Sequence, residues 1–157
     1  MNVTIPMKQS RTISTRLVLP PDTNHHETIF GGRVLAYIDE IAAISSMKHS
    51  NTPVVTASID SVDFLSPARA GDVLELEAVV SSTGRTSMEV YVRVRSFNVV
   101  TGKSKLTTES FVTMVAVDEN GRPVPVPSVV PETEEEKRLF ETGQARREYR
   151  KKRKTLK

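Results

Sequence analysis

The chain has 157 residues, of which 38% are hydrophobic and 26% are charged, the balance of an ordinary soluble globular protein. It contains no cysteine, which excludes disulfides, thiolate nucleophiles and cysteine-ligated metal sites and fits a reducing compartment. The net charge of +3 is unevenly distributed, because residues 144–157 hold eight Lys or Arg and a single Glu. Residues 1–143 are therefore acidic overall, which argues against a folded body that binds nucleic acid.

The sequence shows no targeting or membrane-spanning segment. Its first residues lack the apolar stretch of a signal peptide. The longest apolar run, residues 34–47, contains Asp39 and Glu40 and is too short to cross a bilayer. A cytoplasmic protein without a membrane span is the expectation.

The first third of the chain predicts one strand and one long helix. Residues 11–20 alternate as a strand does and stop at a proline pair, after which residues 22–30 form a polar loop. A Gly-Gly pair then opens an apolar segment that reads as a helix to about residue 50. Apolar side chains occupy most of the circumference of this helix, so we expect it to be buried on nearly all sides.

Residues 54–117 predict an antiparallel sheet. Four β-rich segments are separated by short turns at residues 67–72, 82–87 and 98–103, and their alternation predicts one solvated face. One helix and a strand meander pack most simply when the sheet curls around the helix. We therefore predict an α+β fold in which five or six antiparallel strands wrap one long buried helix.

The C-terminal part predicts an extension of a different kind. Proline-rich residues 122–131 are extended, and the charged segment after them is expected to be helical in its first half, with a break at Gly143. We predict a domain over residues 1–127 and a charged extension over residues 128–157. Its basic end resembles a nucleic-acid or anionic-membrane patch, but a solvated or frayed terminus is the favoured interpretation.

Asp39 is the candidate catalytic residue. A carboxylate in a packed helix often belongs to a salt bridge or a subunit interface. Here, however, Gly32, Ala36, Asp39 and Ala43 follow one another at helical spacing, so the carboxylate lies in a stripe of small side chains that leaves room beside it. A general base lining a pocket is the favoured interpretation.

The segment before Asp39 carries further candidates. Gly31 and Gly32 could simply form a turn, but they also open a helix whose first N–H groups lack partners and could bind an oxyanion. Asn24 lies just upstream and could hold a carbonyl or a water. His25 and His26 are adjacent and lack a third ligand at suitable spacing, so no metal is expected and substrate contact or loop packing is favoured.

A second candidate substrate contact is the turn over residues 82–87. Arg85 supplies charge there, and Thr86 and Ser87 supply hydroxyl and backbone donors suited to a phosphate or a pantetheine chain. A hairpin turn with a solvated arginine explains the same residues equally well.

Residues 23–40, together with the turn at residues 67–72 and the strand order, resemble the hot-dog-fold acyl-CoA thioesterases. The similarity is to the acyl-CoA hydrolase subgroup that includes brain acyl-CoA hydrolase and its small bacterial relatives. This resemblance implies hydrolysis of acyl-CoA to a free fatty acid and CoA, with no cofactor besides the CoA of the substrate. It also implies dimers whose sheets join edge to edge, commonly three dimers to a hexamer, with active sites at the dimer interface.

The resemblance also assigns roles to residues. It places the catalytic pair on Asn24 and Asp39, which in such proteins face each other from different subunits. Asp39 would activate water or attack directly, Asn24 would orient the water or the thioester, and the N–H of Gly31 or Gly32 would polarise the carbonyl. Several relatives carry a small or amide residue where this chain has Glu27, which would put a second carboxylate near the substrate.

Two other functions remain open from the sequence. A non-catalytic hot-dog module could bind acyl-CoA and contact nucleic acid through its basic tail. A dehydratase acting on hydroxyacyl thioesters is the least favoured, because that chemistry usually requires a histidine at the site and the helix carries Asp39 instead.

Overall fold

The computed structural model describes residues 3–156. Its strands are β1 (Thr4–Pro6), β2 (Thr12–Leu17), β3 (Val54–Phe64), β4 (Val73–Thr83), β5 (Ser87–Phe97), β6 (Ser104–Ala116) and β7 (Ser128–Val130). Its α-helices are α1 (Gly31–Ser50), α2 (Glu134–Glu141) and α3 (Gly143–Thr155), and short 3-10 turns cover Met7–Ser10 and Pro20–Asp22. None of these helices is long and apolar enough to cross a membrane.

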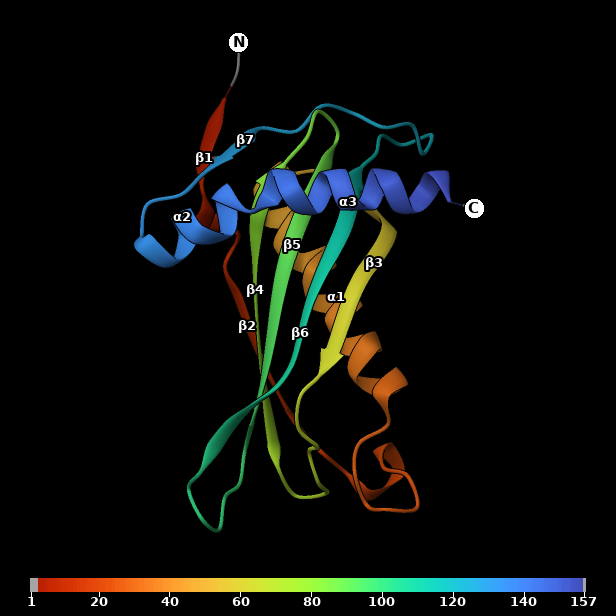
Figure 1. Cartoon of the computed structure of the whole chain (residues 1–157), viewed down its shortest axis with the longest axis vertical. Helices are drawn as coiled ribbons and strands as arrows, with labels where there is room; N and C mark the ends of the chain where they lie inside the picture. Colours follow the sequence, from red (N-terminus) through yellow and green to blue (C-terminus); the bar gives the residue numbers. More distant parts are fainter. Residues whose placement is uncertain (1–2, 157) are drawn as a thin grey trace.

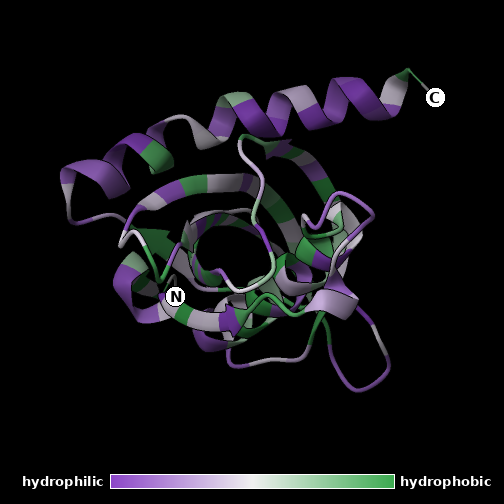
Figure 2. Ribbon diagram, turned by 90° about the horizontal axis from the view of Figure 1, so that it is seen from below, coloured by the Kyte–Doolittle hydropathy of each residue, from purple (hydrophilic) through white to green (hydrophobic). Residues whose placement is uncertain are grey.

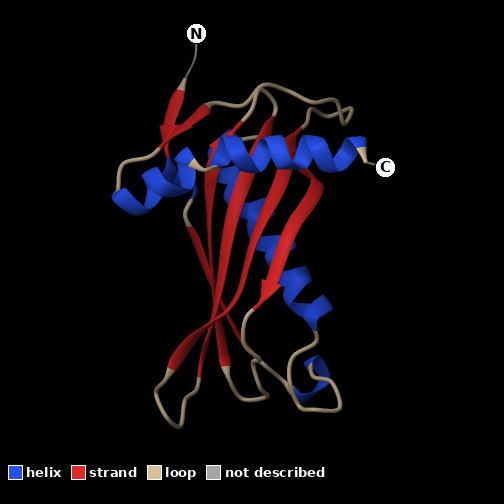
Figure 3. Cartoon of the chain, in the orientation of Figure 1, coloured by secondary structure: helices blue, strands red, loops and turns tan. Residues whose placement is uncertain are grey.

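The predicted wrapping of a sheet around a helix is confirmed. Five antiparallel strands lie in the order β2-β4-β5-β6-β3, and α1 runs behind them along the strands (Figure 1). A second sheet pairs β1 with β7 in parallel. Figure 3 shows the layers, with α1 on one side of the five strands and α3 on the other.

The core lies between α1 and the concave face of the sheet. Alternate residues of each strand point inward, as the period of two requires. The buried side chains come from one face of α1 and from the three central strands: Val34, Ile38, Ile41, Ala42, Leu74, Leu76, Val90, Val92, Val112 and Met114. This packing fixes the rotation of α1 about its own axis.

The prediction that α1 is buried on nearly all sides is wrong for a single protomer. Ile44 and Met47 are 37% and 40% exposed, and Gly32 and Ala36 are exposed as well. The sheet covers only one side of the helix, so the apolar residues on the other side face outward. An exposed apolar surface of this kind marks an interaction site.

The C-terminal extension also differs from the prediction. It is helical on both sides of Gly143, and the two helices meet at that residue. Seen from below, α2 and α3 lie outside the curve of the sheet and are mostly hydrophilic (Figure 2). The basic end is neither frayed nor simply solvated, because three of its arginines form ion pairs with Glu89 on β5 and Asp60 on β3. The outer face of the sheet is therefore partly covered.

Gly143 allows this close docking. A Cβ atom at this position would lie 2.9 Å from both side-chain atoms of Ser82 on β4, closer than real side-chain contacts come. The helix begins so near the sheet that only a glycine fits there without displacement.

Candidate active site

The polar loop at residues 22–30 packs against the turn at residues 67–72. The Ile29 N–H donates to the Ala68 carbonyl at 2.8 Å, and the Ala70 N–H donates to the Glu27 carbonyl at 3.3 Å. These are the two sequence segments that carry the family resemblance, and the fold places them side by side beneath the start of α1 (Figure 1).

Asn24 organises the loop. Its Oδ1 accepts the backbone N–H of His26 at 2.9 Å and that of Thr28 at 3.3 Å, and its Nδ2 donates to Thr28 Oγ1 at 3.0 Å. The loop closes through Glu27, whose backbone takes the left-handed conformation with φ of 63°. These bonds fix the orientation of the Asn24 amide, and they use one of the two N–H groups on its nitrogen.

The other polar residues of the loop form its exposed tip. His25, His26 and Glu27 are exposed, and the two imidazole rings lie against each other with centroids 3.9 Å apart. Over residues 3–156, no group of three or more His, Asp or Glu side chains is placed to hold a metal ion. The tip therefore presents imidazole and carboxylate groups to whatever approaches the start of α1.

The start of α1 opens onto a hollow. Phe30 precedes the helix, and the first helical hydrogen bonds are those from Arg33 and Val34 to the Phe30 carbonyl. The N–H groups of Gly31 and Gly32 precede these bonds, as the first donors of any helix do. A hollow of about 360 Å³ lies next to Gly31, and its lining is mostly apolar: Thr28, Ile29, Gly31, Val34, Phe64, Leu65, Ser66, Pro67 and Ala68.

Gly31 and Gly32 differ in their surroundings. The ring of Phe64 on β3 covers Gly31 so closely that a Cβ there would lie 3.3 Å from the ring. Around Gly32 the space is open: apart from its chain neighbours and the adjoining helix backbone, no atom of the described residues lies within 4 Å of a Cβ placed there. Gly32 is therefore exposed and leaves room on its Cβ side, whereas Gly31 is covered.

Asp39 lies two turns further along α1, where the helix passes the edge strand β3. Its Oδ1 accepts a hydrogen bond from Thr56 Oγ1 at 2.6 Å. Asp39 is half-buried and Thr56 is exposed, so in one protomer the carboxylate is in contact with solvent. The interpretation that Asp39 lines a dry pocket is therefore not met by a single copy, because the carboxylate and its partner Thr56 both reach solvent there.

Thr56 was missed by the sequence analysis. Residues 54–64 contain three hydroxyl side chains, and nothing in their sequence distinguishes the one that meets Asp39. A threonine three residues after a proline, in a strand rich in β-branched residues, reads as ordinary strand composition.

The remaining predicted site residues lie apart. Within residues 3–156, no hydrogen bond joins Asn24 to Asp39, and Asp39 is roughly 12 Å from Gly31 along the helix axis at 1.5 Å per residue. The turn with Arg85, Thr86 and Ser87 lies at the other end of the molecule from the loop (Figure 1). There the carbonyl of Arg85 accepts the N–H of Val126, so the backbone of this turn supports the proline-rich segment.

Comparisons with known proteins bear on the whole chain. The thioesterase superfamily matches residues 26–103. An uncharacterised acyl-CoA thioester hydrolase from Bacillus subtilis is 50% identical over 147 residues, which is 94% of this chain and 86% of that one. The chain belongs to the thioesterase superfamily. Within it, the chain groups with the acyl-CoA thioester hydrolases, and the hot-dog fold expected from the resemblance is confirmed.

Solved structures of this group are closely similar. The crystal structure of an apo-hexameric acyl-CoA thioesterase is 70% identical, with a TM-score of 0.97 over 99% of both chains. An acyl-CoA hydrolase from Staphylococcus aureus, in complex with butyryl coenzyme A, coenzyme A and coenzyme A disulfide, is 48% identical, with a TM-score of 0.93. That match covers 98% of this chain and 93% of the other. By contrast, the chain spans only 38% of the rat cytosolic acyl coenzyme A thioester hydrolase.

Three variants of the Staphylococcus aureus enzyme have a bearing on the site. In each, a single aspartate, asparagine or threonine is replaced by alanine. The three positions have the same spacing along that chain as Asn24, Asp39 and Thr56 have along this one.

Proposed function

We propose that this thioesterase hydrolyses fatty acyl-CoA to a free fatty acid and CoA, with Asp39 as the residue that activates water. The observation that carries the proposal is the Asp39–Thr56 contact, two turns along a helix that begins at a Gly-Gly pair. The relatives named above act on acyl-CoA, and the Staphylococcus aureus variants at the same spacing support this choice of residues.

The reaction needs a base, a donor for the developing oxyanion and a leaving thiolate. Asp39 takes a proton from water, and the resulting hydroxide attacks the thioester carbonyl carbon. Asp39 is roughly 12 Å from Gly31 of its own chain, so the donors that meet the same carbonyl are those of a second copy. There the N–H groups of Gly31 or Gly32, with the positive end of the α1 dipole, stabilise the oxyanion, and one such donor is typically worth about 3 kcal/mol. When the C–S bond breaks, the CoA thiolate takes up the proton held on Asp39.

Thr56 orients the base. Its hydroxyl donates to one oxygen of Asp39 and thereby fixes the carboxylate, leaving the second oxygen free to bind water. Direct attack by Asp39 on the thioester is the competing route. A single turnover in ¹⁸O-labelled water tests for direct attack. Label in the Asp39 carboxylate can arise only when water opens a mixed anhydride at the Asp39 carbonyl, whereas base catalysis labels only the fatty acid.

A second copy completes the site in this proposal. Asn24 lies in the loop below α1 and Asp39 lies on the uncovered side of that helix, so a partner docked on this side can bring its Asn24 to Asp39. The apolar surface left open by Ile44 and Met47 supports this placement. We propose a dimer as the smallest active unit and three dimers as the complete assembly.

The rest of the substrate is assigned by chemistry. His25 and Glu27, at the exposed loop tip, are placed to contact substrate at the start of α1. Because Arg85, Thr86 and Ser87 lie at the far end of the protomer, they would bind the CoA moiety of a substrate held by a neighbouring copy. We propose a cytoplasmic site of action, with CoA acting as part of the substrate and no further cofactor.

The first experiment measures release of free thiol from acetyl- to palmitoyl-CoA. We expect Asp39→Asn to lower kcat by about 10²- to 10⁴-fold, the usual contribution of a general base, and Thr56→Ala to lower it by roughly tenfold. Glu40→Gln is the matched control, because Glu40 is the next carboxylate on α1 and pairs with Arg16 on the surface. Absence of thiol release from the wild type, or equal activity of Asp39→Asn, contradicts the proposal.

The second experiment tests the subunit arrangement by complementation. Subunits with Asn24→Ala and subunits with Asp39→Ala are each expected to be nearly inactive alone. If the pair comes from different subunits, a mixed dimer regains one intact site, so co-expression restores activity. No recovery in purified mixed oligomers means that Asn24 and Asp39 act from the same chain or do not act together.

A further inference from the structure

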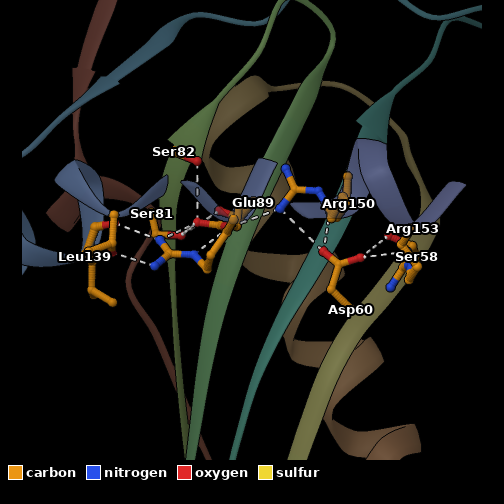
Figure 4. Close-up of polar contacts among 11 residues, drawn as sticks. Ser58, Asp60, Ser81, Ser82, Glu89, Leu139, Arg150 and Arg153 are labelled. Atoms are coloured by element: carbon orange, nitrogen blue, oxygen red, sulfur yellow. Dashed lines mark hydrogen bonds and ion pairs between the residues drawn. The ribbon is translucent and has the colours of Figure 1, made fainter. Parts of the chain in front are cut away.

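The three arginines that dock α3 form a continuous ionic cluster with two carboxylates of the sheet (Figure 4). Arg146, Arg150 and Arg153 share one face of α3, since they are spaced by four and three residues. Arg146 donates twice to Glu89 on β5 at 2.8 Å, and Arg150 lies between Glu89 at 3.2 Å and Asp60 at 3.4 Å. Arg153 donates to Asp60 at 3.0 Å.

The cluster is shielded from water on the side of the sheet. The Glu89 side chain is 1% exposed and that of Asp60 is 9% exposed. Asp60 also accepts the hydroxyl of Ser58 at 2.8 Å and that of Thr113 on β6 at 3.3 Å. The Asp60 carboxylate is therefore held from three elements, namely its own strand, β6 and α3.

Asp60 also occupies an irregular position in β3. Two register shifts interrupt the pairing of β3 with β6, one between Thr56 and Ser58 and one between Ile59 and Ser61. Asp60 is thus the unpaired residue of the second bulge, and Ala57 is that of the first. A bulge re-aims the side chains that follow it and is frequent next to active sites.

The first bulge determines what β3 can contact. In a regular strand, residues two and four apart point to the same face, so Thr56, Ser58 and Asp60 would share one. Instead, Thr56 is opposite the buried Met114 and points to α1, whereas Ser58 is opposite Thr113 and belongs to the outer face. Strand β3 thus contacts Asp39 on its inner side through Thr56 and the arginines of α3 on its outer side through Asp60, four residues later.

We infer that Asp60, through its ion pairs with Arg150 and Arg153, is a positioning residue for thioester hydrolysis. The ion pairs fix the bulged segment of β3 from outside, and the bulged segment sets the place of Thr56 against Asp39. Within a protomer β3 is an edge strand that bonds to β6 along one side only, and the ion pairs with α3 hold it on its outer face as well. The inference rests on the proposed function of Asp39.

The test variant is Arg153→Gln, which removes one ion pair of Asp60 from the more exposed end of the cluster. Displacing a catalytic group by 1 Å can cost a hundredfold in rate, so a shift of a few tenths of an ångström predicts a loss of kcat of roughly tenfold. We expect KM to change by less than about twofold, because the variant touches no substrate contact. Lys152→Gln is the matched control, with the same charge change one residue away on the exposed face of α3.

Two further variants separate positioning from general stability. Arg153→Lys keeps a charged donor and is expected to recover most of the lost kcat. In a Thr56→Ala background, Arg153→Gln should lower kcat by less than about twofold more, because the contact that it disturbs is already gone. Asp60→Asn should behave as Arg153→Gln does, and oligomer mass by light scattering should be the same for every variant.

Several outcomes overturn the inference. If Arg153→Gln lowers kcat equally in the wild type and in the Thr56→Ala background, Asp60 does not act through Thr56. If Lys152→Gln lowers kcat as much as Arg153→Gln does, the effect comes from net charge alone. Unchanged kcat in both Arg153→Gln and Asp60→Asn is equally decisive. If instead wild type and Asp39→Asn have the same activity, the proposed function itself fails, so the two failures are distinguishable.

Discussion

The Glu89 carboxylate is the centre of the contacts that dock α3, and replacing it by glutamine is the sharpest test of those contacts. It accepts two bonds from Arg146 at 2.8 Å, one from Arg150 at 3.2 Å and one from Ser81 at 2.7 Å. Glutamine keeps the shape and one acceptor oxygen, but it turns an N–H group toward a guanidinium. Arg146 then loses its carboxylate partner beside a buried site, and Arg150 keeps only its ion pair with Asp60.

Breaking one partner out of a buried ion pair costs about 3–5 kcal/mol. Because Arg146 is 22% exposed and can relax toward water, we expect Glu89→Gln to lie at the lower end, at about 3 kcal/mol of unfolding free energy. For a chain of this length, a loss of 1 kcal/mol lowers the midpoint of thermal unfolding by roughly 2–4 °C, so Glu89→Gln should lower that midpoint by about 6–12 °C. Urea unfolding followed by circular dichroism gives the free energy, at one fixed protein concentration because the assembly contributes to stability.

Two variants check this reasoning. Glu75→Gln on β4 removes a carboxylate from the exposed part of the same face and should change the free energy by less than about 0.5 kcal/mol. Adding Arg146→Met to Glu89→Gln removes the unpaired charge and should recover part of the loss. The reasoning is refuted if Glu89→Gln is as stable as Glu75→Gln. It is also refuted if the double variant loses more free energy of unfolding than Glu89→Gln and Arg146→Met lose when measured separately and added.

Two other predictions follow from buried contacts elsewhere. His49 donates through Nε2 to the Pro127 carbonyl at 2.7 Å, and burial lowers its pKa from the usual 6.5 even though this bond raises it in part. As pH falls, His49 is therefore protonated in the unfolded chain before it is protonated in the folded one. The free energy of unfolding should then fall as pH drops below 6.5, by up to about 1.4 kcal/mol per pH unit. In urea unfolding at several pH values, His49→Gln should reduce this dependence on pH. Gly143→Ala should lower the free energy of unfolding by about 1–3 kcal/mol, because the added Cβ clashes with Ser82. Adding Ser82→Gly should restore part of that loss. If the losses of the two single variants simply add in the double variant, the clash is not with Ser82.

The helix and the sheet could be predicted because their patterns repeat over many residues. The apolar segment after Gly31 and the alternation through residues 73–117 give α1 and the central strands with small errors at their ends. The turn at residues 82–87 is shorter than expected, because β4 continues to Thr83 and β5 begins at Ser87. Element type is a local property, and the sequence carries it directly.

The bulges of β3 and the cover of its outer face could not be predicted. A one-residue insertion in a ladder depends on the partner strand, so the sequence gives no sign that Ala57 and Asp60 are unpaired. The alternation correctly puts Glu89 on the outer face, and an outward carboxylate reads as solvated. Only the fold shows that α3 returns over it, because that contact joins residues 57 positions apart.

The candidate site was predictable in part for the same reason. Asp39 and the Gly-Gly pair stand out because they break a local pattern, and Asn24 belongs to the same short segment. Their meeting is not a property of one chain, since Asn24 is bound within its own loop and Asp39 faces outward. Thr56 required the packing of β3 against α1, which no pattern within residues 54–64 encodes.

The uncovered edge of β3 has a consequence for how the protein is made. A freshly folded protomer presents an unpaired strand edge together with Val55 and Phe64, which are 49% and 53% exposed, and such a surface recruits other chains indiscriminately. Its bulges counter this hazard, since an interrupted ladder accepts another strand in few registers and does not extend into a fibre. Association with a partner soon after synthesis and the interrupted edge of β3 thus both protect the protein against aggregation. Variants that remove the bulges would make β3 more regular and the protein less soluble.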